Sequence, residues 1–496
     1  MENRKLGIIF ILAVALAFFA GFQVQTFFVD NEPEPFVDVY TEITEALDRY
    51  YLYDLEDAEK EAAFLAQMQG IVSSYAEAND DPYTRLFSNP VGLAPTDAES
   101  YIGIGITIQN EFDFLRVLDV TYQGPSYQKL YPNDMIVGLV IDDQQVYFKD
   151  LDQNINITSY LAGTKDETKS LIVVHPDETE EVIDITYDEI LTPTAYHQTI
   201  SDGIGYIKIT EFSSYIEGVT EGTAKVFSDS LNTLESELLK DETDTLIIDL
   251  RNNPGGALSA LHNNNESGVI PGILQLLLQK DVERPLFSMI NKNDVTTNYL
   301  GGLSTPKAYD IKVLVNEYSA SAAEVLAAAL SINGGYELYG MPTYGKDVYQ
   351  NTVSLTTINS MTYYLTYTEG YWLYDQGKKI SENPLNVELI IQEGYQAIEQ
   401  MMFEEELSID MVDDSLINYQ AFLNLYFELD DNNLIRTDGY FDQKTEDYLL
   451  QFQQENSLTE SEKLDFETAS HMFDLLKQYQ NDMQYDYQLQ EVIGMI

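Results

Sequence analysis

Strand-like and helical runs alternate along the chain between about Leu191 and Glu393, and this alternation limits the possible folds more than any other feature. Strands that alternate with helices usually form a parallel or mixed sheet whose faces the helices cover. We therefore predict an α/β fold for residues 190–395. The helical stretches are 216–239, 257–281 and 322–331. The strand-like runs are IGYIKIT (204–210), TLIIDL (245–250), KVLVN (312–316) and YELYG (336–340).

Three segments with other patterns flank this region. Residues 99–187 carry short alternating runs separated by Gly, Asp, Asn and Pro, which predict an inserted β-rich module. Apolar residues spaced three and four apart predict a helical region at 35–90. Residues 405–480 are rich in Asp, Glu, Gln, Tyr and Leu and lack strand-like runs, so we predict a small all-α module there. No internal repeat is apparent.

The first 30 residues have the pattern of a membrane anchor or signal segment. Arg4 and Lys5 precede 24 uncharged residues, Leu6 to Val29, and about 20 apolar residues suffice to span a bilayer. The basic flank predicts that this end stays in the cytoplasm and that the rest of the chain lies outside, at the cell membrane. Ala20-Gly21 keeps a cleaved signal peptide open as an alternative. A buried core helix is the third reading.

Composition excludes several classes of function. The chain has 83 acidic and 26 basic side chains, a formal net charge of −57, which repels nucleic acid. It has no Cys, so thiolate metal sites and Cys nucleophiles are excluded, and none of its four His lies in an H-E-x-x-H motif. We expect no metal and no cofactor, and catalysis that depends on other side chains.

Two loop-to-helix junctions in the α/β region are candidates for chemistry. Gly255 and Gly256 follow a strand-like run, where adjacent glycines let backbone N–H groups converge on an anion, although an ordinary turn explains them equally well. Ser321 begins a helical run and forms the capping-box pattern S-x-x-E with Glu324, so it could simply cap that helix. The same position suits a nucleophile, because free N–H groups at a helix N-terminus stabilise negative charge. Lys346 is the nearest candidate base, and a solvated surface lysine is its plain alternative.

These segments together resemble a known family. DDPYTRLF, GIGI, LIIDLRNNPGG, NEYSASAAEVLAAAL and TYGKDVYQ occur in this order within residues 37–395, as in the C-terminal processing peptidases, also called tail-specific proteases. The resemblance implies a crotonase-like α/β core and a serine endopeptidase. It makes Ser321 the nucleophile and Lys346, 25 positions later, the general base, with Gln350 holding the lysine. The oxyanion hole would combine the N–H groups of Ala322 and Gly255.

The flanking modules also resemble known domains. YIGIGITI resembles the carboxylate-binding loop and strand of a PDZ domain, so the candidate residues for capture of a protein C-terminus are Ile102, Gly103, Ile104, Gly105 and Ile106. The segment 434–458 resembles the repeat of a peptidoglycan-binding helical domain. Its matching residues, which turn and core roles would also explain, are Asp438, Gly439, Phe441, Thr445, Phe452 and Gln453.

Departures from the family pattern keep a rival hypothesis open. Asp347 stands beside the proposed base, where a carboxylate would favour the charged lysine unless its side chain points away. Leu161-Ala162-Gly163 replaces the usual L-R-G, and Asp143 stands where Gly is usual. The rival is a weakly catalytic scaffold that captures protein C-termini without cutting them. In either case we expect protein partners with accessible tails, the membrane, peptidoglycan as a further partner, and a homodimer as one oligomeric option.

Overall fold

The computed structural model describes residues 43, 57–90, 100–151, 156–216, 220–263, 270–358 and 361–496. The chain divides into two compact units, residues 1–86 and 87–496. The described part of the first unit contains the helix α3 (Asp57–Glu77). The predicted membrane segment Leu6–Val29 lies outside the described residues, and no helix within them is long and apolar enough to cross a bilayer.

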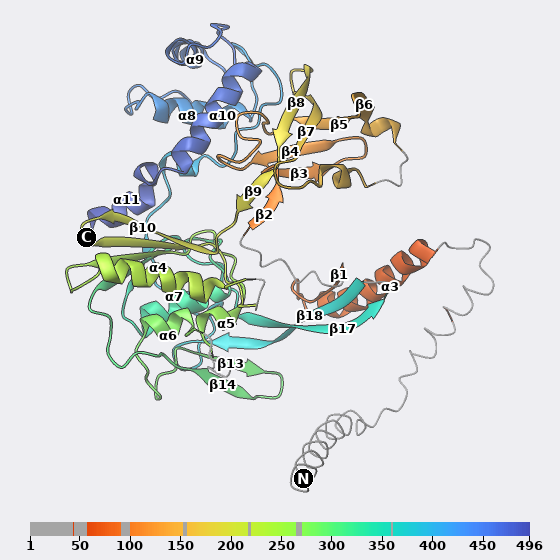
Figure 1. The fold of residues 1–496 in the computed structure, drawn as a ribbon. Helices are drawn as coiled ribbons and strands as arrows, with labels where there is room; N and C mark the ends of the chain where they lie inside the picture. The colour runs from red at the N-terminus through yellow and green to blue at the C-terminus, as the bar shows by residue number, and fades with distance from the viewer. Residues whose placement is uncertain are drawn as a thin grey trace. The chain divides into compact units, whose positions relative to one another are not determined.

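A mixed six-stranded sheet forms the centre of the second unit (Figure 1). The strand order is β10-β11-β12-β15-β16-β19, with β10 antiparallel to β11 and the other neighbours parallel. Asp249 pairs with Leu314 and Val315 with Gly340, so β12, β15 and β16 end at the same edge. The predicted α/β arrangement is therefore present. The strands are β10 (Ala195–Ser201), β11 (Ile204–Ile209), β12 (Thr245–Asp249), β15 (Asp310–Val315), β16 (Glu337–Gly340) and β19 (Glu388–Leu389).

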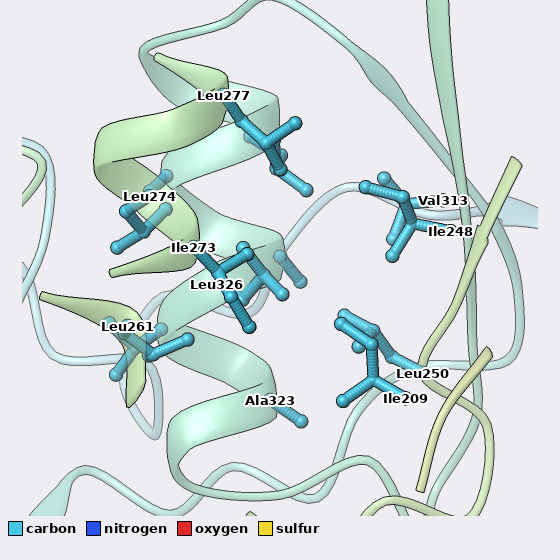
Figure 2. Packing of buried hydrophobic residues seen from close by; sticks show 14 of the residues in the cluster. Ile209, Ile248, Leu250, Leu261, Ile273, Leu274, Leu277, Val313, Ala323 and Leu326 are labelled. Carbon is cyan, nitrogen blue, oxygen red and sulfur yellow. The ribbon is translucent and has the colours of Figure 1, made fainter. Parts of the chain in front are cut away.

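Four helices pack on one face of this sheet (Figure 1). They are α4 (Thr223–Glu237), α5 (Leu258–Leu261), α6 (Ile273–Leu277) and α7 (Ala322–Ile332). Figure 2 shows Ile273 and Leu326 of the helices facing Ile248 and Val313 of the strands, with Leu261 behind them and Leu250, which follows β12, beside Ile209. The single helical stretch predicted at 257–281 is wrong. The described residues of this stretch form two short helices, because Pro271 lacks an N–H and a Cβ on Gly272 would lie 2.3 Å from the carbonyl oxygen of Leu261.

The opposite face of the sheet is covered by the last helix, α11 (Tyr487–Gly494). Side chains alternate between the two faces of a strand, so Leu246 and Ile248 meet the four helices while Ile247 meets α11. Leu489 and Val492 of α11 are fully buried in this second cluster. Both faces of the strands are apolar for this reason.

Segments of the same region, residues 190–395, also form a second, antiparallel sheet. The long hairpin of β17 (Val348–Ile358) and β18 (Met361–Leu373) continues through β18 into β13 (Phe287–Asn291) and β14 (Thr296–Tyr299). Gln350 pairs with Thr368 across the hairpin. The strand β1 (Arg85–Pro90) contains the boundary between the two units.

The β-rich module contains a sheet of order β3-β4-β5-β7-β8, with β6 paired to β5, so β3 is an edge strand. A separate two-stranded ribbon, β2 (Ser100–Gly103) with β9 (Asp188–Leu191), precedes and follows it. The short helices η1 (Phe148–Asp150) and η2 (Ile157–Leu161) complete the described part. The sheet strands are β3 (Ile106–Asn110), β4 (Leu115–Val120), β5 (Met135–Ile141), β6 (Gln144–Tyr147), β7 (Thr168–Val174) and β8 (Glu180–Thr186).

The C-terminal part is helical and contains an internal repeat. Its helices are η3 (Gly394–Ala397), α8 (Leu416–Tyr426), α9 (Gln443–Glu455), α10 (Phe466–Gln480) and η4 (Met483–Tyr485). Gln420 on α8 donates to Thr445 Oγ1 in the first turn of α9, and Gln453 on α9 donates to Thr468 Oγ1 in the first turn of α10. Few positions are shared between the copies, which explains why the sequence alone shows no repeat.

Candidate active site

Ser321 lies at the N-cap of α7, where the chain leaves β15, and its backbone is strained. Its φ of 56° and ψ of −114° are unusual for a residue with a side chain. Strained non-glycine residues persist only where their surroundings hold them, and they concentrate at functional sites. Ser321 is half-buried, whereas Ala322 is fully buried. The hydroxyl is therefore presented at the edge where β12, β15 and β16 end.

Glu324 joins the backbone of Ser321 to the backbone of Lys346. Its carboxylate is fully buried, and Oε2 accepts hydrogen bonds from the N–H of Ser321 at 2.8 Å and from the N–H of Lys346 at 2.9 Å. Oε1 accepts the N–H of Gly345 at 2.6 Å. Because one oxygen serves both backbones, the two nitrogens lie within the sum of two hydrogen-bond lengths of each other.

Burial sets the electrostatics of this carboxylate. It raises the pKa of Glu324 above its ordinary value, although the hydrogen bonds from Gly345, Ser321 and Lys346 act in the opposite direction. The sequence interpretation treated Glu324 only as half of a capping box. The missed signal is a charged residue inside the otherwise apolar run AAEVLAAAL, since such a residue on a buried helix needs several partners.

Lys346 is oriented by groups on the β17–β18 hairpin. Its Nζ donates to Gln350 Oε1 at 2.7 Å, and Gln350 Nε2 donates to Thr368 Oγ1 at 3.3 Å. The indole N–H of Trp372 donates to the carbonyl oxygen of Lys346 at 2.7 Å, which fixes the backbone at this point. Lys346 and Gln350 are thus in contact, as their spacing implied. Thr368 and Trp372 were not among the predicted residues.

The carboxylate of Asp347, the neighbour that put the base in doubt, has a partner of its own. Asp347 Oδ2 accepts a hydrogen bond from the hydroxyl of Ser381. Lys346 Nζ donates instead to the uncharged amide of Gln350. The side chain of Asp347 is therefore engaged by Ser381, and its effect on the proposed base stays a prediction.

The glycine turn, Asn252–Gly256, lies directly against Ser321. A Cβ on Gly255 would be 2.8 Å from Ser321 Cβ and 3.0 Å from the nitrogen of Ala322. Gly255 and Gly256 have φ values of 105° and 128°, which other residues rarely adopt. Close approach and backbone conformation together require glycine here, so the plain-turn interpretation of this motif is incomplete.

The structure corrects the choice of glycine for the oxyanion hole. The N–H of Gly255 already donates to Asn253 Oδ1 at 2.8 Å, and Gly255 is buried. Gly256 is exposed, and within the described residues no acceptor takes its N–H or that of Ala322. The sequence could not show which of the two glycine N–H groups is available, because this depends on the hydrogen bond from Gly255 to the side chain of Asn253.

A pair of asparagines ties the glycine turn to the serine turn, residues 316–321. The N–H of Asn252 donates to Asn316 Oδ1 at 2.9 Å, and Asn316 Nδ2 returns a bond to Asn252 Oδ1 at 2.8 Å. The buried Ser319 donates from its hydroxyl to the carbonyl oxygen of Leu250 at 2.8 Å. These contacts fix the relative position of Ser321 and the glycines.

The five residues predicted to capture a peptide do not form one loop. Ile102 and Gly103 belong to β2 and pair with Glu189 and Asp188 of β9. Ile104 is buried in the core of the β-rich module, Gly105 makes a turn with φ of 71°, and Ile106 opens β3. Only the last part of the motif therefore lies on the free edge strand.

The residues that resemble a peptidoglycan-binding repeat have structural roles here. Phe441 and Phe452 are fully buried, and Thr445 and Gln453 belong to the repeated hydrogen-bond pattern. Gly439 has a φ of 78° and Asp438 accepts hydrogen bonds from Arg436. The turn-and-core alternative accounts for all of them, and ligand binding by this module stays a prediction.

Comparison with known proteins covers the region that contains Ser321 and Lys346. Residues 203–388 match the sequence model of Peptidase family S41. "Carboxy-terminal processing protease CtpB" of Bacillus subtilis is 26% identical over 473 residues, which cover 94% of this chain and 90% of that protein. "Carboxyl-terminal-processing protease" of Picosynechococcus sp. is 30% identical over 288 residues, 56% of this chain and 62% of that protein. A solved structure titled "Photosystem II D1 C-terminal processing protease" is 19% identical over 71% of this chain and 86% of that one, with a TM-score of 0.38, too low to add weight.

The match at 203–388 indicates a serine-type peptidase. Within this match lie the strained Ser321 at the N-terminus of α7 and Lys346, whose backbone N–H binds the same buried carboxylate. Residues 203–388 of the chain match peptidase family S41, and the chain resembles carboxy-terminal processing proteases over most of its length.

Proposed function

We propose that the chain is a serine endopeptidase in which Ser321 is the nucleophile and Lys346 is the general base. Ser321 Oγ attacks the carbonyl carbon of the scissile bond while its proton moves to the neutral amine of Lys346. The resulting ammonium gives that proton to the leaving amine, and an acyl-enzyme ester remains. A water molecule then attacks the ester, losing its proton to Lys346, which returns it to Ser321 Oγ. The observation that carries this proposal is that the backbone N–H groups of Ser321 and Lys346 donate to the same oxygen, Glu324 Oε2.

One partner of the Lys346 amine, the side chain of Gln350, suits a base that must be neutral before it reacts. An anionic partner would favour the ammonium form, whereas the amide oxygen of Gln350 carries no net charge. The nearest carboxylate in sequence, Asp347, accepts from Ser381. Gln350 therefore orients the amine without opposing its deprotonation.

The oxyanion donors we propose are the N–H groups of Ala322 and Gly256, in place of the predicted Gly255. Two donors aimed at the carbonyl oxygen stabilise the charge that develops in the transition state, and each is worth about 10²–10³ in kcat. Gly256 is exposed and flanked by two backbone hydrogen bonds to Phe212, which hold its own N–H in a fixed direction.

The test of the proposed chemistry uses an unstructured protein as substrate. Ser321→Ala and Lys346→Ala should each abolish cleavage, while Lys378→Ala, which removes an exposed lysine paired with Asp375, should leave it unchanged. Cleavage that survives Ser321→Ala would refute the mechanism. The scaffold alternative, which the comparisons do not favour, would be supported if the wild-type chain cut nothing under any condition.

We also propose that the β-rich module is a PDZ domain that captures the C-terminal tail of the substrate. A tail could add as a strand to the free edge of β3, with its carboxylate near the turn at Gly105. Cleavage of a substrate with a free C-terminus should then be faster than cleavage of the amidated form. Equal rates for the two forms would count against capture at this edge.

The location that fits these modules is the outer side of the cell membrane. We propose an N-terminal anchor at Leu6–Val29, contact of the C-terminal module with peptidoglycan, and a homodimer formed through the N-terminal helical region. Fractionation of cells expressing Ser321→Ala, binding of residues 87–496 to isolated cell walls, and sedimentation of the soluble chain test these three points separately. Recovery in the cytoplasm, no retention on walls or a monomer would contradict each in turn.

A further inference from the structure

The side chain of Arg251 connects the start of the glycine turn to the last helix of the chain. Arg251 lies two residues after the end of β12 and is 7% exposed. Its guanidinium donates to both oxygens of Asp249, from Nε at 3.0 Å and from Nη2 at 2.7 Å. It also donates to both oxygens of Asp486, from Nη1 at 2.8 Å and from Nη2 at 2.6 Å. Arg251 is therefore held between two side-chain carboxylates, that of Asp249 at the end of β12 and that of Asp486 at the start of α11.

Gln488 supplies a third partner from the same helix. Its Oε1 accepts from Arg251 Nη1 at 3.1 Å, and its Nε2 donates to the carbonyl oxygen of Ile390 at 2.6 Å. Gln488 is 2% exposed, so water does not replace these contacts. The charges of the cluster balance closely, because Lys208 lies 4.0 Å from Asp249 Oδ2 and the hydroxyl of Tyr206 donates to the same oxygen.

The helix that carries these groups is itself anchored. Asp486 caps α11, accepting the N–H of Leu489 at 3.1 Å, and Leu489 and Val492 are fully buried against the central sheet. An N-cap carboxylate on a packed helix has little freedom to move. The position of Arg251 is consequently set by α11 as much as by β12.

Arg251 in turn controls where the glycine turn begins. It directly precedes Asn252, whose N–H is bonded to Asn316, and Gly256 follows five residues after Arg251. The turn is thus fixed from one side by the serine turn and from the other by Arg251. Oxyanion donors work only when they are held within about 0.5 Å of the productive geometry.

We propose that Asp486 and Gln488 are positioning residues of the peptidase site, acting through Arg251 on the N–H of Gly256. The inference rests on the proposed function. It extends that function to the C-terminal helix, which lies about 165 residues after Ser321 in sequence and would complete the oxyanion hole. In this proposal Asp486 and Gln488 act through Arg251 and not through the substrate. Their effect is on the transition state, because the donor they align matters only once the oxyanion forms.

The experiment compares Asp486→Asn with Asp482→Asn in the full chain. Asn caps a helix as well as Asp does, so the first change removes the charge and one acceptor while keeping α11. Asp482 caps η4 through Gln484 in the same way but is exposed and makes no contact with Arg251. Measured quantities are kcat, KM, the Ki of a peptide boronic acid that forms a tetrahedral adduct with serine, and the melting temperature.

For Asp486→Asn we expect kcat to fall about tenfold, less than the 10²–10³ cost of losing an oxyanion donor outright, with KM within about twofold of wild type. The Ki of the boronic acid should rise by the same factor as kcat falls, since it mimics the transition state. Asp486→Glu, which keeps a carboxylate, should recover part of the loss, and Asp482→Asn should match wild type.

A second variant covers the case in which Asp486→Asn does not fold. Gln488→Met removes one acceptor of Arg251 at similar volume and should lower kcat about threefold, again with a parallel rise in Ki.

Three results would overturn the inference. They are an unchanged kcat in both variants, a rise in KM that accounts for the whole effect, and an equal loss in Asp482→Asn. If Ser321→Ala cleaves the substrate as fast as the wild-type chain does, the proposed function fails. This outcome is distinguishable, because Ser321→Ala is measured before any α11 variant is made.

Discussion

Replacing Glu324 by Gln isolates the carboxylate that joins the nucleophile to the base. The substitution keeps the shape of the side chain but leaves one oxygen where there were two. The carboxylate accepts three backbone N–H groups, two at Oε2 and one at Oε1. The amide of Gln accepts through one oxygen only, and its NH₂ group faces the N–H groups left over. If the amide oxygen takes the place of Oε2, the N–H of Gly345 loses its acceptor. If it takes the place of Oε1, the N–H groups of Ser321 and Lys346 lose theirs.

The magnitude follows from these contacts. A hydrogen bond to a charged group is worth about 1.5–3 kcal/mol, and a buried donor left without a partner costs about 1–3 kcal/mol. We expect the free energy of unfolding to fall by about 2–4 kcal/mol. The loop that carries Lys346 should shift relative to Ser321, and a misplacement of about 1 Å costs roughly 10²-fold in rate. The variant should thus remain folded but lose about 99% of kcat.

The assay pairs urea unfolding with steady-state cleavage of an unstructured protein. Glu317→Gln is the matched control, because Glu317 is an exposed glutamate of the same serine turn. Its stability and kcat should stay close to wild type. A Glu324→Gln variant that retains kcat within about twofold would refute the idea that this carboxylate positions the base.

Three further predictions concern other parts of the molecule. Gly255→Ala should abolish activity, because its Cβ would lie 2.8 Å from Ser321 Cβ. The control is Gly335→Ala, where φ is also positive but no atom lies within 4 Å of the new Cβ, and it should keep full kcat. Equal activities of the two variants would contradict the close approach of Gly255 to Ser321. Burial raises the pKa of Asp474 to about 7, so this group stabilises the folded chain at low pH and loses that contribution as pH rises through 7. Melting temperatures should therefore fall less between pH 5 and 8.5 in Asp474→Asn than in wild type or in the exposed control Asp447→Asn, and parallel curves would disprove the assignment. Phe473→Ala should cost about 3–5 kcal/mol in urea unfolding, because Phe473 of α10 is buried in the core of the β-rich module; a loss below 1 kcal/mol would mean that this contact is absent in solution.

The sequence predicts the parts of this molecule that depend on periodicity and spacing. Alternating strand and helix runs predict the mixed sheet, since burial on both faces of β12 and β15 demands continuous apolar runs. The four-residue spacing of Lys346 and Gln350 places both on one side of the start of β17, where they are in contact.

The parts that depend on tertiary contacts could not be predicted. Asn253, through its own side chain, decides that Gly255 is not a free donor. Glu324 reaches Lys346 across 22 residues, and Asp486 reaches Arg251 across 235 residues. None of these pairs leaves a periodic signal in the sequence. The pairing of Ile102 and Gly103 with β9 leaves none either, so the sequence wrongly groups these two residues with the predicted peptide-binding loop.

Covalent labelling of the soluble chain by a fluorophosphonate, followed by mass spectrometry of its peptides, tests whether Ser321 is a nucleophile activated by Lys346. We expect one modified residue, Ser321, with labelling that is lost in Lys346→Ala and kept in Lys378→Ala. Labelling of a different serine, or an equal labelling rate of Ser321 without Lys346, would contradict a Ser321–Lys346 pair.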